Sequence, residues 1–156
     1  MKASLTALVA VMLLMLGSAP AAYAHCEIPC GIYDDQLRIS LLKENITTIE
    51  KSMAEITRLA AAGEKNYNQL IRWVNNKEQH AGRFMEIVAQ YFMTQRLKPA
   101  DPSDGEVYLK YQAQLSLLHR MLFYAMKCKQ TTASEHTTTL RKLVDEFADL
   151  YFESGS

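Results

Sequence analysis

The sequence has no net charge, because 17 Lys and Arg balance 17 Asp and Glu over 156 residues. Nucleic acids and anionic membrane surfaces recruit clearly basic proteins, so this balance argues against either as the main partner. Cysteine is scarce as well, with three residues in the whole chain. Because that number is odd, a complete disulfide framework is not the natural interpretation, even for an exported protein.

Long apolar runs are also missing, except for one near the start of the sequence. That run is Leu5 to Leu16, which follows Lys2 and precedes the small-residue pattern Ala22-Tyr23-Ala24. A run of this length is too short to cross a bilayer, for which about 20 residues are needed. We therefore expect residues 1–24 to be an export signal that a signal peptidase removes after Ala24. An uncleaved interfacial helix is the alternative.

Removal of this segment would leave residues 25–156, which are enough for one domain with its own hydrophobic core. Only one charge, that of Lys2, would be lost, so the argument against nucleic acid still holds. We expect the processed protein to lie in the periplasm or outside the cell, without a membrane anchor.

The rest of the sequence shows no strand-like alternation, and apolar residues recur there at helical spacing. Four stripes with spacings of three and four residues run from Leu42 to Ala60, Tyr67 to Tyr91, Tyr108 to Ala125 and Leu140 to Leu150. Gly63, Lys98-Pro99 and Thr131-Thr132 separate them, and Ser134 is a candidate N-cap for the last helix. The pattern predicts an all-α fold, an antiparallel up-down four-helix bundle preceded by an N-terminal segment.

Helical bundles often hold a carboxylate-bridged pair of iron ions. Such a site requires Glu-x-x-His on two of the helices. This motif occurs nowhere in the sequence, which excludes that class of enzyme. We therefore look for the chemistry in the segment that precedes the first helix.

That segment is His25-Cys26-Glu27-Ile28-Pro29-Cys30-Gly31-Ile32-Tyr33. If cleavage makes His25 the first residue, a terminal amine, an imidazole, a backbone amide and two thiolates lie within six positions. Pro29 and Gly31 suit a turn that brings both sulfurs to one point. Sulfur and nitrogen donors in one plane favour nickel(II) or copper(II), whereas zinc prefers a tetrahedron.

Two other interpretations of these cysteines stay open. Cys26 and Cys30 could form a disulfide after export, which is the default for two close cysteines in a secreted protein. The same chelate could also serve an exported helical protein that sequesters copper or nickel without turnover. Cys128 stands apart near the end of the third helix, and we expect it to be a buried, small apolar residue rather than a ligand.

The pattern His-Cys-x-x-Pro-Cys-Gly-x-Tyr at a processed N-terminus resembles the nickel-binding hook of the nickel-containing superoxide dismutases. That family is a four-helix bundle of similar length, usually a homohexamer. The resemblance implies one nickel ion per chain, held by the His25 amine, the Cys26 amide nitrogen and the sulfurs of Cys26 and Cys30. The His25 imidazole would be an axial ligand in nickel(III). The implied reaction disproportionates superoxide to oxygen and hydrogen peroxide by Ni(II)/Ni(III) cycling.

The resemblance also assigns residues around the metal. Tyr33 matches a tyrosine that limits access of small anions and orders water, and Tyr91 is the candidate for a second one. In the better-known members a glutamate and an arginine hold the axial imidazole, and Ser40 and His80 stand at those positions here. Such partners fix the orientation of a ligand ring and tune the metal. We predict that His80 supports the His25 ring, directly or through water, although a satisfied or surface histidine is the alternative.

Overall fold

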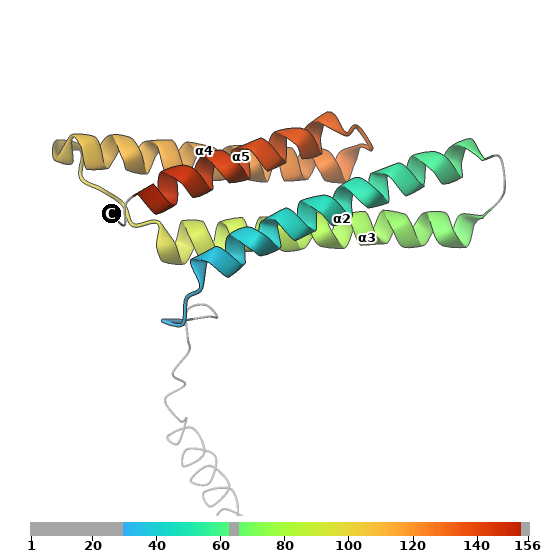
Figure 1. Ribbon diagram of the computed structural model, residues 1–156, viewed down its shortest axis with the longest axis horizontal. Coiled ribbons are helices and arrows are strands. Elements are labelled where there is room, and N and C mark those ends of the chain that lie inside the picture. Colours follow the sequence, from blue (N-terminus) through green and yellow to red (C-terminus); the bar gives the residue numbers. More distant parts are fainter. Residues whose placement is uncertain (1–29, 63–65, 154–156) are drawn as a thin grey trace, which may run out of the picture. The chain divides into compact units, whose positions relative to one another are not determined.

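The computed structural model describes residues 30–62 and 66–153. Four α-helices run through these ranges, and no strand occurs in them: α2 (Asp35–Ala61), α3 (Tyr67–Glu86), α4 (Glu106–Gln130) and α5 (Glu135–Phe152). Two further elements, η1 (Ile87–Arg96) and η2 (Pro102–Asp104), lie between α3 and α4. Helices α2 and α3 form one antiparallel pair and α4 and α5 another (Figure 1). The predicted all-α four-helix bundle is confirmed.

Helix α2 follows the sequence pattern closely. The Asp34 side chain accepts a hydrogen bond from the Leu37 amide at 2.9 Å, which caps the first turn. One face is buried, at spacings of three and four residues: Ile39, Leu42, Ile46, Ile49 and Met53. The predicted stripe is therefore confirmed from Leu42 to Met53, and the structure extends it one turn earlier. Its predicted last residue, Ala60, is exposed.

The stripe predicted for the second helix is only half right. Its later residues, from Ala81 to Tyr91, lie in the core, but Tyr67 is 62% exposed and Val74 is 36% exposed. Figure 1 shows the physical reason, because the end of α2 and the start of α3 extend past the connection between α4 and α5. The first turns of α3 therefore have α2 beside them but no second hairpin to cover their apolar face.

The core itself is closed by residues from all four helices and η1. Its largest fully buried side chains include Phe84, Phe92, Phe147, Leu118 and Leu140. Cys128 also has no exposed surface, and burial raises the pKa of its thiol to about 11, as expected for a structural cysteine. Within the described ranges no helix is long and apolar enough to span a membrane.

Lys77 is a buried charge that the sequence pattern does not predict. Its side chain is 5% exposed and donates to the main-chain carbonyls of Cys128 and Lys129, at the C-terminal end of α4, as well as to Glu78. Those carbonyls have no partner within α4, and a cation is favourable at this end of a helix. Lys77 therefore joins α3 to the end of α4.

The backbone changes from α to π geometry after Glu86. Over Ile87–Arg96 the chain is a π-helix, in which each hydrogen bond spans five residues instead of four. The Leu97 amide accordingly donates to the Phe92 carbonyl at 2.8 Å. Because each turn contains more residues than in an α-helix, positions five apart come closer to one side of the helix, as Tyr91 and Arg96 do here.

Two predicted boundaries are also found, with a difference at the second. Helix α4 ends at Gln130, directly before the predicted break at Thr131-Thr132. Ser134 occupies the N-cap position of α5, but its side chain makes no capping bond. Instead, its carbonyl accepts a hydrogen bond from the hydroxyl of Thr137 at 2.8 Å.

Candidate functional site

The structure covers only the second half of the predicted metal-binding segment. His25 and Cys26 lie outside the described residues, whereas Cys30 and Tyr33 lie within them. Cys30 is exposed, so its thiol is accessible as a soft ligand, and Gly31 has a φ of 78°. Residues other than glycine rarely adopt that conformation, which supports the predicted turn at this position. Within residues 30–62 and 66–153, no three His, Cys, Asp or Glu residues gather to hold a metal.

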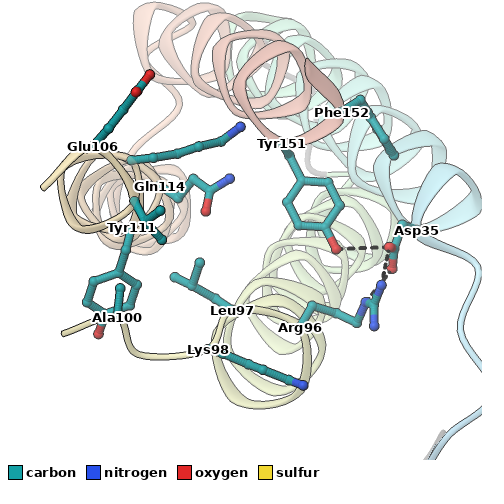
Figure 2. Close-up of a pocket in the computed structure, with 12 residues that line it drawn as sticks. Asp35, Arg96, Leu97, Lys98, Ala100, Glu106, Tyr111, Gln114, Tyr151 and Phe152 are labelled. Carbon is teal, nitrogen blue, oxygen red and sulfur yellow. Dashed lines mark hydrogen bonds and ion pairs between the residues drawn. The ribbon is translucent and has the colours of Figure 1, made fainter. Parts of the chain in front are cut away.

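Directly after this turn, Asp35 is the centre of a hydrogen-bond network. Its carboxylate accepts from the Tyr91 hydroxyl at 2.6 Å, the Tyr151 hydroxyl at 2.9 Å, and Arg96 Nε and Nη2 at 2.8 and 2.7 Å. Figure 2 shows the bonds from Arg96 and Tyr151. Partial burial opposes the charge on Asp35, but the hydrogen bonds from Arg96 and the two tyrosines hold its pKa below the usual value.

The network also sets the protonation of Tyr91 and Tyr151. Burial and the hydrogen bond to Asp35 raise the pKa of Tyr91 to about 12 and also raise that of Tyr151. Both phenols therefore stay neutral at ordinary pH, and each gives its single proton to Asp35. The oxygen of Tyr91 can accept another hydrogen bond but cannot donate one.

Tyr33 packs against this network through its ring. It lies edge-on to Tyr91, with ring centroids 5.8 Å apart, and the Arg96 guanidinium lies 4.4 Å from its ring centre. Tyr33 is 39% exposed, and its hydroxyl has no hydrogen-bond partner among the described residues. The structure thus brings the two predicted tyrosines together but makes them unequal, since only Tyr33 keeps a phenolic proton that it can donate.

Tyr33 and Tyr91 are called the tyrosine pair. Arg38 also contacts this pair, because its guanidinium lies 4.9 Å from the centre of the Tyr91 ring. Its Nε is buried and has no hydrogen-bond partner. The sequence gives no sign that Arg38 lies beside Tyr91. Asp35, Arg96 and Tyr151 had no signal of their own, because the partners of Asp35 lie 61 and 116 positions away along the chain.

A cavity of about 710 Å³ lies beside the network. Asp35, Arg96 and Tyr151 line it, together with apolar side chains that include Leu97 and Phe152 (Figure 2). The tyrosine pair is not part of its lining. Asp35 and Arg96 therefore belong both to the wall of this cavity and to the support of the tyrosines.

His80 is held by Asn45. His80 Nδ1 lies 2.7 Å from Asn45 Oδ1, while Asn45 Nδ2 donates to the Leu41 carbonyl at 2.8 Å. Since the amide nitrogen is used in that bond, Oδ1 must accept, and the proton of a neutral His80 ring must be on Nδ1. Burial, and secondly the positive charge of Arg83, lower the pKa of His80, although Glu44 opposes this. Nε2 is thus left as an acceptor.

Ser40 is the other position that the sequence analysis named with His80. Among the described residues, its side chain bonds to no other helix. It is exposed, and its hydroxyl donates to the carbonyl of Gln36, in its own helix, at 3.0 Å. Of Ser40 and His80, therefore, His80 is the better placed to accept a hydrogen bond from another group.

Comparison with known proteins gives one informative result. The family model described as nickel-containing superoxide dismutase matches residues 20–155. No curated protein and no solved structure gives a match. The family match spans the whole bundle together with the positions of the predicted metal-binding segment, and its resident cofactor is nickel. The chain therefore belongs to the family of nickel-containing superoxide dismutases, which are oxidoreductases.

Proposed function

We propose that the protein disproportionates superoxide at a nickel ion held by the first six residues of its processed chain. The ligands would be the amine of His25, the amide nitrogen of Cys26 and the sulfurs of Cys26 and Cys30, and the His25 imidazole would be a further ligand. The family match over residues 20–155 carries this proposal. The exposed thiol of Cys30 and the turn at Gly31 support it, because soft sulfur beside nitrogen suits nickel.

When bound, nickel supplies the redox chemistry by alternating between Ni(II) and Ni(III), so that one superoxide becomes oxygen and a second, with two protons, becomes hydrogen peroxide. The protein must admit a small anion, exclude larger ones and order the water that carries protons. Tyr33 can do this, since it follows Cys30 by three residues and its hydroxyl has no partner among the described residues. In this division of roles, Tyr33 donates a hydrogen bond to the anion or to water.

Tyr91 then acts as a positioning residue. Its hydroxyl is committed to Asp35, so its contribution is the ring against which Tyr33 packs. Arg96, fixed by two hydrogen bonds to the same carboxylate, holds the Tyr33 ring from another side. Positioning of this kind matters because a displacement of about 1 Å in a reacting group can reduce a rate about 100-fold.

His80 would support the axial imidazole. Its Nε2 can accept a hydrogen bond from the His25 ring, directly or through water, and Asn45 fixes the tautomer that makes this possible. A partner of this kind fixes the orientation of a ligand ring and adjusts its basicity. At the position of the arginine of the better-known members, this chain would thus supply a neutral acceptor for the ring.

We further propose that signal-peptide cleavage after Ala24 creates the amine ligand, that the protein is exported to the periplasm or beyond the cell, and that it assembles as a homohexamer. Cleavage is part of the site in this proposal. An amide at the same nitrogen would replace a primary amine and displace the ring.

The decisive experiment combines three measurements on protein purified from an exporting host. We expect the mature N-terminus at His25, about one nickel per chain, and rapid consumption of superoxide. A protein that only sequesters metal would bind nickel or copper without turnover. Cys26→Ser should abolish both nickel binding and turnover, with Cys128→Ser as a matched control because Cys128 is buried away from solvent. Turnover that survives Cys26→Ser would contradict the ligand set.

A further inference from the structure

Arg38 is a cation beside the tyrosine pair that has no counter-ion among the described residues. Its guanidinium lies over the ring of Tyr91, and within the described residues the side chain forms no hydrogen bond or ion pair. Its Nε is buried without an acceptor. A buried donor without a partner is unfavourable, and a native structure keeps one for a reason, such as a ligand or an ion that it binds.

Three other arginines of the bundle form ion pairs, whereas Arg72, Arg83 and Arg120 form none among the described residues. Arg96 binds Asp35, Arg141 binds Glu50, and Arg58 binds Glu55. Of the unpaired arginines, Arg38 is the one with a buried Nε that has no acceptor. The carboxylate nearest to Arg38 along the chain that could neutralise it is Asp34, but Asp34 accepts from the Leu37 amide and caps α2. Asp35 is neutralised by Arg96. Neither carboxylate pairs with Arg38, so within the described residues its guanidinium forms no ion pair.

The charge of the proposed metal site explains why a cation without an ion pair would be useful here. Nickel(II) carries two positive charges, whereas two thiolates and a deprotonated amide contribute three negative ones. Such a site would be anionic and would repel an anionic substrate, so a nearby cation is needed to raise the local concentration of the anion. Arg38 lies against the ring of Tyr91, which contacts Tyr33, and can supply that field.

We propose that Arg38 recruits small monovalent anions, superoxide in catalysis, to the face formed by Tyr33 and Tyr91. This inference rests on the proposed function and adds a substrate-guiding residue to it. Arg38 acts through its charge and through N–H groups that have no acceptor among the described residues. Arg96 cannot do the same, because its charge is already balanced by Asp35.

The first test is the dependence of superoxide kcat/KM on ionic strength. Arg38→Gln should lower kcat/KM about fivefold at low salt. The difference from the wild type should vanish at about 1 M salt, where the Debye length falls to about 3 Å. Arg38→Lys keeps the charge and should retain most of the rate. Arg58→Gln is the matched control, since it removes the same charge from the far, exposed end of α2 and should change neither the rate nor its salt dependence.

A second test does not depend on turnover. In protein labelled with nitrogen-15, the Nε–H signal of Arg38 can be assigned by its loss in Arg38→Lys. Titration with azide, a small monovalent anion, should shift this signal to saturation and leave the corresponding Arg58 signal in place. This measurement works with nickel bound or removed, and it remains informative if Arg38→Gln should fold poorly.

The outcomes separate the two proposals. If wild-type protein binds nickel and turns over superoxide, but Arg38→Gln keeps the wild-type salt dependence and azide leaves the Arg38 signal unmoved, the inference about Arg38 is wrong and the proposed function stands. If the wild type neither binds nickel nor consumes superoxide, the proposed function fails first, and the guiding of superoxide fails with it.

Discussion

Asp35 and Arg96 stand 61 positions apart in the chain and meet in a two-pronged ion pair, with Nε and Nη2 at 2.8 and 2.7 Å from the two carboxylate oxygens. Their side chains are 17% and 29% exposed, so the pair is mostly shielded from water. It joins the first turn of α2 to the last turn of η1, and Tyr151 adds the end of α5. One carboxylate thus fixes three elements around the tyrosine pair.

The first prediction concerns this carboxylate. Asp35→Asn should lower the free energy of unfolding by about 2–3 kcal/mol, because Arg96 would lose its counter-ion while two phenols lose a charged acceptor. Turnover should fall as well, since Tyr33 packs against both Arg96 and Tyr91. Urea unfolding of the nickel-free protein measures the first effect. Glu55→Gln breaks an exposed ion pair within α2 and should cost less than about 1 kcal/mol. Equal losses in the two variants would contradict the central role of Asp35.

The second prediction is a pH dependence with a defined sign. The folded-state pKa of Asp35 lies below its ordinary value of 3.8, so folding favours its charged form. The stabilisation is therefore fully present above the unfolded-state pKa and is lost as the pH falls through the folded-state pKa. We expect the difference in unfolding free energy between wild type and Asp35→Asn to be constant from about pH 7 to 5 and to shrink below about pH 4. A difference that stays unchanged into that acid range would be evidence against the shifted carboxyl.

The third prediction separates the two tyrosines. Tyr91→Phe removes a hydrogen bond to a charged acceptor and should destabilise the protein by about 1–2 kcal/mol. Tyr33→Phe should leave stability nearly unchanged, because its hydroxyl has no partner among the described residues, yet it should alter turnover or inhibition by small anions. Thermal unfolding and steady-state kinetics on both variants check this. The reverse pattern would show that the phenolic proton needed in the site belongs to Tyr91.

Much of the fold could be predicted because helical burial leaves a local pattern. The stripe from Leu42 to Met53 and the break after Gln130 each depend on residues close together in the chain. The exposed start of α3 could not be predicted in this way. Tyr67 and Val74 have helical spacing, but whether a neighbour covers them depends on how far the second hairpin extends.

The surroundings of the site were harder to predict for a geometric reason. In an α-helix, residues five apart lie about 140° around the axis, so Tyr91 and Arg96 would point to different neighbours. The π-helix of η1 brings both to Asp35. The periodicity that identifies helices assumes the α geometry. The pattern from His25 to Tyr33, by contrast, carried the chemistry in consecutive residues and needed no tertiary information.

The fourth prediction concerns processing. A variant with one extra residue before His25 in the mature chain should lose nickel binding and turnover, because the amine would become an amide. The bundle should keep its helical content and its unfolding transition, since the core formed by the described residues begins at Ile39. Metal analysis and circular dichroism on the two forms provide the measurement. Full nickel occupancy in the extended form would exclude the terminal amine as a ligand.

The fifth prediction tests the support of the axial ring. His80→Ala should change the electron paramagnetic resonance spectrum of the nickel(III) state and reduce turnover, because Nε2 would no longer be present to accept a hydrogen bond from the His25 ring. Asn45→Ala should produce a smaller change in the same direction, since it frees the His80 ring and its tautomer while keeping the imidazole. His119→Ala removes an exposed histidine from α4 and should change neither property. An unchanged spectrum in His80→Ala would show that His80 serves only its hydrogen bond to Asn45, and the axial imidazole would then need a different partner.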